Sequence, residues 1–221
     1  MMKDLSKAKE IMLKEHLESR GIINPRVISA FRDVPREQFV PREIRELSYE
    51  DMPLEIGSGQ TISQPYTASF MTQLLDPKPD DIVLEVGTGS GYQAAILSRL
   101  VKKVYTIERF EELAEKAKEV LKSLGYKNVE VIVGDGSKGL PSVALAKDGF
   151  DGIIVTAGAP KIPQPLIDQL KIGGRLVIPI GTDAQTMTKI TRTGKSLPAV
   201  RQETFRGFRF VPLVGKHGFA I

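Results

Sequence analysis

Three alternating glycines, Gly87, Gly89 and Gly91, constrain the fold of this 221-residue chain more than any other feature. They follow directly on an apolar segment at 82–86, and an amphipathic segment begins at Tyr92. Glycine lets the backbone approach a ligand closely, and the first turn of the following helix directs free N–H groups at that ligand. The pattern therefore predicts the first strand–loop–helix unit of a doubly wound nucleotide-binding fold.

The spacing of these glycines indicates the kind of nucleotide. It is G-x-G-x-G rather than the G-x-G-x-x-G of dinucleotide enzymes, and Glu85 lies two residues ahead of the first glycine. We interpret this combination as favouring S-adenosylmethionine, which carries adenosine but no pyrophosphate.

The central part of the chain alternates between strand-like and helix-like patterns, which predicts a parallel sheet with helices on both faces. We expect strands at 82–86, 103–107, 129–133, 150–155 and 175–180, and helices near 92–100, 110–124 and 164–170. Gly173 and Gly174 are interpreted as a helix stop before the last of these strands. Two further strands, 186–193 and 199–206, are expected to form an antiparallel addition, joined at 193–195.

The N-terminal part has a helical pattern interrupted by prolines. Helices are expected at 3–20, from Pro25 to about Phe31 with Asn24 as N-cap, and at 66–75. The segment between Pro53 and Pro65 is rich in turn residues.

Composition excludes several classes of function. The net charge is only +4, and basic residues do not cluster beyond pairs such as Lys102–Lys103, so we expect no nucleic-acid partner. The chain has no cysteine, which rules out disulfides and thiol chemistry, and no acid or histidine cluster has metal-ligand spacing. No apolar run approaches the ~18 residues of a membrane span, and we expect no signal peptide and a cytoplasmic location.

Ligands of such sheets bind beyond the carboxyl ends of the strands, which makes the residues there candidates. Glu108 ends the second strand and could accept both ribose hydroxyls; the alternative is an exposed acid at a helix start. Asp135, after the third strand, could accept the adenine amino group, and an ordinary Asp-Gly turn explains it equally well. The small residues at 156–160, after the fourth strand, leave room near a reacting centre or form a compact loop.

The side chains present limit the chemistry. His16 and His217 are the only histidines, so a histidine base has few candidates; we expect His16 at the surface and leave the role of His217 open. A carboxylate substrate needs no base, because its pKa of about 4 leaves it ionised at neutral pH. The fourth strand is not followed by the Asn/Asp-Pro-Pro-aromatic run with which amino-group methylases of nucleic acids hold a base.

With these segments, the chain resembles the protein-L-isoaspartate (D-aspartate) O-methyltransferase family from about residue 34 to 218. The most specific motif is 60–65, Gln-Thr-Ile-Ser-Gln-Pro; others are 85–95, 134–136, 159–163, 170–181 and 210–213. The resemblance implies a Rossmann-like S-adenosylmethionine-dependent methyltransferase fold: a doubly wound, mostly parallel α/β sheet with antiparallel C-terminal strands and an N-terminal helical extension. It also implies an altered order of the last two strands. Gly158 departs from the pattern, since an alanine is expected there.

The resemblance also implies a repair reaction, methylation of the free α-carboxylate of isoaspartyl residues, with roles for particular residues. Ser63 would be the active-site serine, and Thr61, Ser63 and backbone around Val214 would bind the peptide. The residues expected to bind the cofactor are Gln60, Thr61, Ser63, Glu85, Gly87, Thr88, Gly89, Ser90, Gly91, Glu108, Asp135 and Gly136.

Together these features predict a single methyltransferase domain over 1–221. Residues 1–79 would form a helical substrate segment, 80–181 the cofactor-binding core, and 182–221 the C-terminal strands and substrate loop. We expect a monomer whose partners are isoaspartyl peptides and proteins. The alternatives are an RNA methyltransferase on the same core and an adenosyl-binding module without catalysis.

Overall fold

The computed structural model describes residues 4–141, 149–194 and 199–220. The helices are α1 (Leu5–Ile11), α2 (Pro25–Asp33), α3 (Pro65–Leu75), α4 (Tyr92–Ser98), α5 (Glu111–Ser123) and α6 (Gln164–Asp168). The strands are β1 (Leu54–Gly57), β2 (Gln60–Ile62), β3 (Ile82–Val86), β4 (Lys103–Glu108), β5 (Val129–Val133), β6 (Phe150–Val155), β7 (Leu170–Ile180), β8 (Gln185–Arg192) and β9 (Val200–Phe208).

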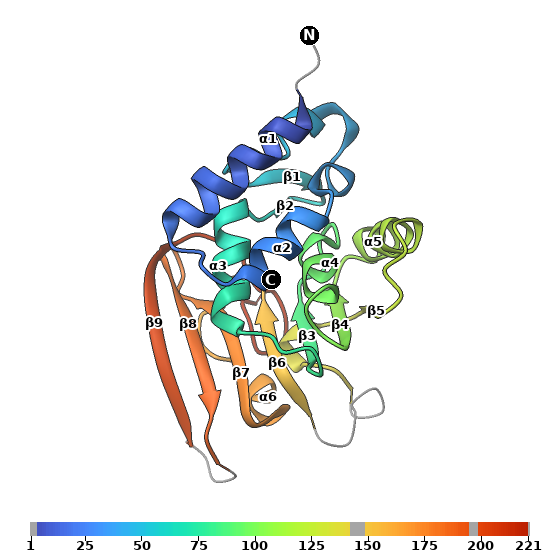
Figure 1. The fold of residues 1–221 in the computed structure, drawn as a ribbon. Helices are drawn as coiled ribbons and strands as arrows, with labels where there is room; N and C mark the ends of the chain where they lie inside the picture. Colours follow the sequence, from blue (N-terminus) through green and yellow to red (C-terminus); the bar gives the residue numbers. More distant parts are fainter. Residues whose placement is uncertain (1–3, 142–148, 195–198, 221) are drawn as a thin grey trace.

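Within the described residues, β3 to β9 form one seven-stranded sheet in the order β5-β4-β3-β6-β7-β8-β9 (Figure 1). Pairing is parallel from β5 to β7, whereas β8 and β9 are added antiparallel and in chain order. The chain therefore extends the sheet from β3 first to one side and then to the other. This arrangement confirms the predicted α/β sheet with antiparallel C-terminal strands.

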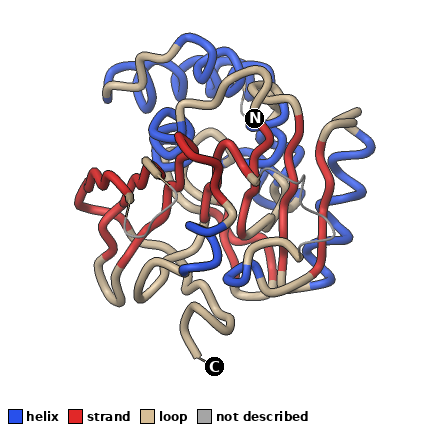
Figure 2. The backbone as a smooth tube through the Cα atoms, turned by 90° about the horizontal axis from the view of Figure 1, so that it is seen from below, coloured by secondary structure: helices blue, strands red, loops and turns tan. Residues whose placement is uncertain are grey.

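Successive side chains of the central strands point to opposite faces of the sheet and enter two separate cores. Val83 and Ile154 pack with residues of α2, α3 and α4, whereas Leu84 and Ile153 pack with residues of α6. Seen from below, most helical turns lie on one side of the strands, and the C-terminus lies on the other (Figure 2). Both faces are covered as predicted, but one much more heavily than the other.

The predicted helix stop at Gly173–Gly174 is wrong. Helix α6 already ends at Asp168, and the glycine pair lies inside β7. The register of β7 against β6 is irregular there, because Leu170 pairs with Phe150 but Arg175 pairs with Gly152. Gly173 has φ +85°, and a Cβ on Gly174 would come within 2.9 Å of two backbone oxygens. The glycines therefore permit a bulge within a strand.

The segment between Pro53 and Pro65 contains a hairpin that the turn-rich pattern did not predict. Strands β1 and β2 pair antiparallel around a tip with positive φ at 57–59. The predicted helix at 3–20 is present from Leu5, but changes from α1 to a π-helical turn at Met12–Leu17 and a 3-10 turn at Glu18–Arg20; residue 3 is outside the described part. The N-cap is confirmed, since Asn24 Oδ1 accepts from Arg26 N.

Further 3-10 turns at Arg36–Phe39 and Arg42–Leu47 were also not predicted. The other predicted boundaries agree to within two residues, apart from the start of β7, and 195–198 of the C-terminal hairpin lie outside the described residues.

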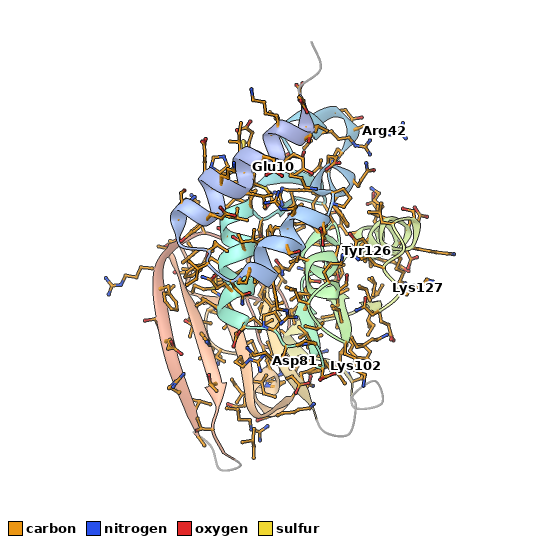
Figure 3. All side chains as sticks on the ribbon, in the orientation of Figure 1. Glu10, Arg42, Asp81, Lys102, Tyr126 and Lys127 are labelled. Atoms are coloured by element: carbon orange, nitrogen blue, oxygen red, sulfur yellow. The ribbon has the colours of Figure 1, made fainter. Side chains whose placement is uncertain are left out.

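A poorly hydrated ion pair connects the end of α3 to β7 and to the start of β3. Arg175 Nη2 lies 2.6 Å from Asp81 Oδ2, with both side chains less than a fifth exposed, and Asp81 lies next to the start of β3 (Figure 3). The same guanidinium donates to the carbonyls of Leu75 and Asp76 at 2.9 and 3.0 Å. Arg175 thus joins three segments that are far apart in sequence.

Replacing Arg175 by Met should lower the free energy of unfolding by about 3 kcal/mol, because the Asp81 carboxylate would lose its cation in a poorly hydrated place. Denaturant unfolding followed by circular dichroism measures this change. The matched control is Arg32→Met, which removes an exposed ion pair with Glu10 of α1 and should cost less than about 1 kcal/mol. Equal losses in the two variants would contradict the anchoring role of Arg175.

Candidate active site

The glycine loop after β3 has a backbone conformation that favours glycine at three positions and leaves no room for a side chain at Gly87. Gly87, Gly89 and Gly91 have φ of +97°, +52° and +86°, in the left-handed region that favours glycine. A Cβ on Gly87 would lie 2.3 Å from Thr156 Oγ1, at the end of β6. The loop lies where the sheet order switches between β3 and β6, which is where ligands of doubly wound folds bind.

A cavity opens over this loop; we call it the glycine-loop cavity. Its lining includes most of the residues predicted for the cofactor: Gln60, Thr61, Ser63, Glu85, Gly87, Thr88, Gly89, Ser90, Glu108 and Gly136. Val214, predicted to contact the peptide, lines it as well, from the C-terminal segment. The structure thus brings together residues from β2, from the ends of β3 and β4, and from the loop after β5.

Gly91 and Asp135 do not line this cavity. Gly91 is the N-cap residue of α4, and a Cβ there would contact Leu121 of α5 at 3.2 Å, so its place follows from packing. Asp135 Oδ1 accepts from Ser137 N and Oγ, and Oδ2 accepts from Lys216 N at 2.9 Å. Partial burial acts to raise the pKa of Asp135, but these hydrogen bonds outweigh it and lower the pKa. Asp135 therefore ties the turn after β5 to the C-terminal segment.

Glu108 extends from the end of β4 to the glycine loop. Its Oε2 accepts from Gly89 N at 2.9 Å, and its Oε1 accepts from Phe110 N at 3.1 Å. The side chain is nearly buried and still lines the cavity. It both shapes the loop and offers its remaining lone pairs to a ligand.

Glu85 is a fully buried carboxyl group beneath the cavity. Its Oε2 accepts from Thr106 Oγ1 at 2.6 Å, and Thr106 Oγ1 is 2.7 Å from Thr88 Oγ1. Its Oε1 has no hydrogen-bond partner among the described residues. Burial raises the pKa of Glu85 to about 8. Without a ligand, Glu85 is therefore mostly protonated at neutral pH, and a cation in the cavity would favour its charged form.

Ser63 lies after β2 and faces two cavities. Together with Thr61, Thr156 and Val211 it lines both the glycine-loop cavity and a neighbouring one, which we call the arginine cavity after Arg20, Arg206 and Arg209 in its wall. The side chain of Ser63 has no hydrogen bond to another described residue and is free to donate to a ligand.

A buried cation that sequence reasoning missed holds the Ser63 loop. Arg36 is fully buried; its Nη2 donates to the Ser63 carbonyl at 2.8 Å and its Nε to the Ser48 carbonyl at 2.6 Å. The guanidinium carbon lies 4.7 Å from the ring centroid of Tyr92, the residue after Gly91. Arg36 thereby joins the Ser63 loop to the helix that follows the glycine loop. No local pattern marks an arginine for burial, since only distant segments exclude water from it.

Of the two histidines, His16 is half-exposed on the N-terminal helical segment, and His217 contributes its backbone N–H to Ser137 Oγ at 3.0 Å. Among the described residues, no cluster of three or more His, Asp or Glu side chains could hold a metal ion. None of the described helices has the length and apolarity that crossing a bilayer requires.

The raised pKa of Glu85 predicts a pH-dependent stability of the ligand-free protein. Between the unfolded value of about 4.3 and the folded value of about 8, only the folded state binds this proton. The contribution of Glu85 to the free energy of unfolding is therefore largest below the unfolded pKa. It decreases by up to about 1.4 kcal/mol per pH unit as the pH rises towards 8. Glu85→Gln should remove this slope in denaturant unfolding between pH 5 and 8.

The control is Glu112→Gln, which alters an exposed carboxylate whose pKa is lowered by Lys116 and which is already ionised in this range. It should leave the slope unchanged. Parallel stability curves for Glu85→Gln and the unmodified protein would show that Glu85 does not titrate there.

Comparison with known proteins agrees with this geometry. The family model of protein-L-isoaspartate(D-aspartate) O-methyltransferase matches residues 7–218. The chain is 53% identical to protein-L-isoaspartate O-methyltransferase 2 of Pelobacter propionicus over 96% of this chain and 92% of that protein. It is 49% identical to protein-L-isoaspartate O-methyltransferase of Petrotoga mobilis over 98% and 100%.

Two solved structures are similar in fold. A protein-L-isoaspartate O-methyltransferase superimposes with a TM-score of 0.80 at 28% identity, covering 95% of this chain and 67% of that one. A candidate protein-L-isoaspartate O-methyltransferase of Plasmodium falciparum, in complex with S-adenosyl-L-homocysteine, gives a TM-score of 0.78 at 27% identity, covering 93% and 97%. With the family model spanning nearly its whole length, this chain belongs to the protein-L-isoaspartate (D-aspartate) O-methyltransferase family.

Proposed function

We propose that this protein transfers the methyl group of S-adenosylmethionine to the free α-carboxylate of L-isoaspartyl and D-aspartyl residues in damaged polypeptides. Membership of the family supports the reaction. The observation that carries the proposal is the position of Ser63, which lies in the wall of both the glycine-loop cavity and the arginine cavity. A group bound in one cavity can therefore meet a group bound in the other beside this residue.

The residues of the glycine-loop cavity fit this cofactor. S-adenosylmethionine carries positive charge, and the cavity holds Glu85, with one unpartnered buried oxygen, and Glu108. In our assignment Gly87, Thr88, Gly89, Ser90 and Gly91 surround the methionyl end together with Glu85, and Gln60, Thr61 and Ser63 close over it. Glu108 accepts from the ribose hydroxyls, and Asp135 and Gly136 border the adenine. Neither Gly91 nor Asp135 lines the cavity, so we assign them indirect roles: Gly91 starts the helix after the glycine loop, and the Asp135 side chain holds the turn that carries Gly136.

When bound, the cofactor supplies a methyl group attached to a positively charged sulfur. This sulfur is a good leaving group. A carboxylate oxygen of the substrate forms the new bond to the methyl carbon while the carbon–sulfur bond breaks and its electron pair stays on sulfur. The reaction transfers no proton, because the carboxylate is already ionised at neutral pH. This explains why the site needs neither a histidine base nor a thiol.

The role of the protein is then to align the substrate carboxylate with the methyl group. We assign to Ser63 Oγ a hydrogen bond to one carboxylate oxygen, which directs the other at the methyl group, with Thr61 beside it. Backbone around Val214 would pair with the peptide; it is already ordered by a bridge to Phe219. Arg36 is a positioning residue, because it holds the Ser63 carbonyl and does not line either cavity. We further propose that the protein acts as a monomer in the cytoplasm.

The direct test is incubation of the purified protein with methyl-labelled S-adenosylmethionine and a peptide containing isoaspartate. We expect base-labile methyl incorporation that is absent for the same peptide with normal aspartate. Transfer to RNA but to neither peptide would support the RNA methyltransferase alternative. Cofactor binding without any transfer would support a silent adenosyl-binding module.

Replacing Ser63 by Ala should lower kcat by about 10²-fold while the Kd for S-adenosylmethionine stays nearly unchanged, since Ser63 Oγ acts on the substrate. Steady-state kinetics and calorimetric titration measure the two effects separately. Unchanged turnover would refute the proposed role.

The reciprocal variant is Glu108→Ala. It should weaken cofactor binding by about 1–3 kcal/mol, because hydrogen bonds to a charged group are lost. Native cofactor affinity in this variant would remove Glu108 from the cofactor site.

A further inference from the structure

The arginine cavity has an unbalanced charge that the methyl transfer itself does not require. It encloses about 730 Å³ on the far side of Ser63 from the glycine loop. Three arginines line it, and no aspartate or glutamate is among the lining residues. β9 runs along the edge of the sheet and ends near the end of the N-terminal helical segment (Figure 1), which explains how Arg20 and Arg206 come to share one cavity.

The three arginines differ in how their charge is used. The charge of Arg20 is already paired within the protein, because its Nη1 lies 2.5 Å from the carboxylate of Asp51 and its guanidinium lies 3.6 Å from the ring centroid of Tyr66. Arg206 and Arg209 are exposed and make no hydrogen bond or ion pair with any other described residue. Two positive charges in the wall of this cavity are therefore uncompensated.

The backbone between these two arginines is open on its outer side at Gly207. Gly207 separates Arg206 from Phe208 and has φ +96°, and no atom lies within 4 Å of the position that its Cβ would occupy. Phe208 and Phe210 provide apolar contacts in the same wall, and Phe208 is stacked on Phe70 with ring centroids 5.5 Å apart. This part of the wall thus combines two aromatic side chains, one of them stacked on Phe70, with two free guanidinium groups.

A peptide whose isoaspartyl carboxylate reaches Ser63 can place neighbouring residues against this wall, because Ser63 also lines the arginine cavity. We infer that Arg206 and Arg209 are specificity-determining residues, which make the enzyme prefer isoaspartyl sites flanked by acidic side chains. The inference rests on the proposed function and deepens it by naming the class of peptide. Guanidinium groups suit this task because they form bidentate hydrogen bonds with carboxylates.

Exposed ion pairs are weak and are screened by salt, which sets the size of the expected effect. Each arginine should contribute about a two- to five-fold preference in KM at low ionic strength. The preference should decrease at 0.5 M salt, where the screening length is only a few ångströms. The value of kcat should depend little on the flanking residues, because they do not touch the reacting atoms.

The experiment uses three peptides that share one isoaspartyl residue and differ only in whether the neighbouring positions carry Glu, Gln or Lys. KM and kcat are measured at 0.05 and 0.5 M NaCl for the unsubstituted protein and for Arg206→Gln, Arg209→Gln and the double variant. We expect the lowest KM for the Glu peptide and the highest for the Lys peptide. In the double variant, the ratio of KM between the Gln and Glu peptides should approach one.

The matched control is Arg201→Gln. Arg201 is an exposed arginine of β9, the strand that carries Arg206. It pairs with Glu203 and does not line the arginine cavity. This variant should keep the full preference for the Glu peptide. Loss of the preference in Arg201→Gln as well would show that overall charge, and not the cavity, selects the peptide, and would overturn the inference.

The inference and the proposed function fail in different ways. Equal KM values for the three peptides at low salt, with normal methylation of all of them, would overturn the inference alone. Absence of methylation of every isoaspartyl peptide would overturn the proposed function and the inference with it.

Discussion

The contact between Gly87 and Thr156 is the constraint on which the site depends. Thr156 Oγ1 donates to the Gly87 carbonyl at 2.7 Å and thereby joins the carboxyl ends of β3 and β6 at the switch in strand order. A side chain at residue 87 would collide with that hydroxyl group. Because the two strand ends are held this close, the glycine loop turns over them and leaves its backbone open to the glycine-loop cavity. The cofactor that we assign to this cavity therefore meets peptide groups more than side chains.

Charged groups withdrawn from water hold the loops around this centre. Arg36 is buried in the interior, where its Nε and Nη2 donate to two carbonyls and its guanidinium lies over an aromatic face, with no carboxylate of a described residue bound to it. Arg175 is partly buried, and its carbonyl partners at the end of α3 tie the helical segment to the sheet. An arginine serves both places because its planar fork donates in several fixed directions at once. The rigid parts of the molecule are thus joined by donors that a shorter or uncharged side chain could not replace.

The two cavities divide the proposed reaction between them. Glu85 and Glu108 line the glycine-loop cavity beside Arg109, whereas the charged side chains that line the arginine cavity are all arginines. A positively charged methyl donor and a negatively charged methyl acceptor are each drawn to a different side of Ser63. Such a separation favours the correct orientation of the two reactants before any bond changes. For a reaction between a sulfonium and a carboxylate, this orientation is the main source of rate acceleration.

The sequence by itself determined the central sheet and the position of the glycine loop. Strands β3, β5 and β6 begin and end where the apolar runs do, because short apolar runs bounded by turn residues are local signals. It did not determine β1 and β2, which are too short to show a period, nor the path of Gly173 and Gly174 through β7, since a bulge depends on the neighbouring strand.

Only the tertiary structure decided which polar groups lose water and what they meet. The burial of Arg36, the partners of Asp135 some 80 residues away, and the meeting of Ser63 with the glycine loop all arise from contacts between distant segments. A residue's own neighbours in sequence fix its local geometry, whereas its hydration and charge environment depend on the packed whole.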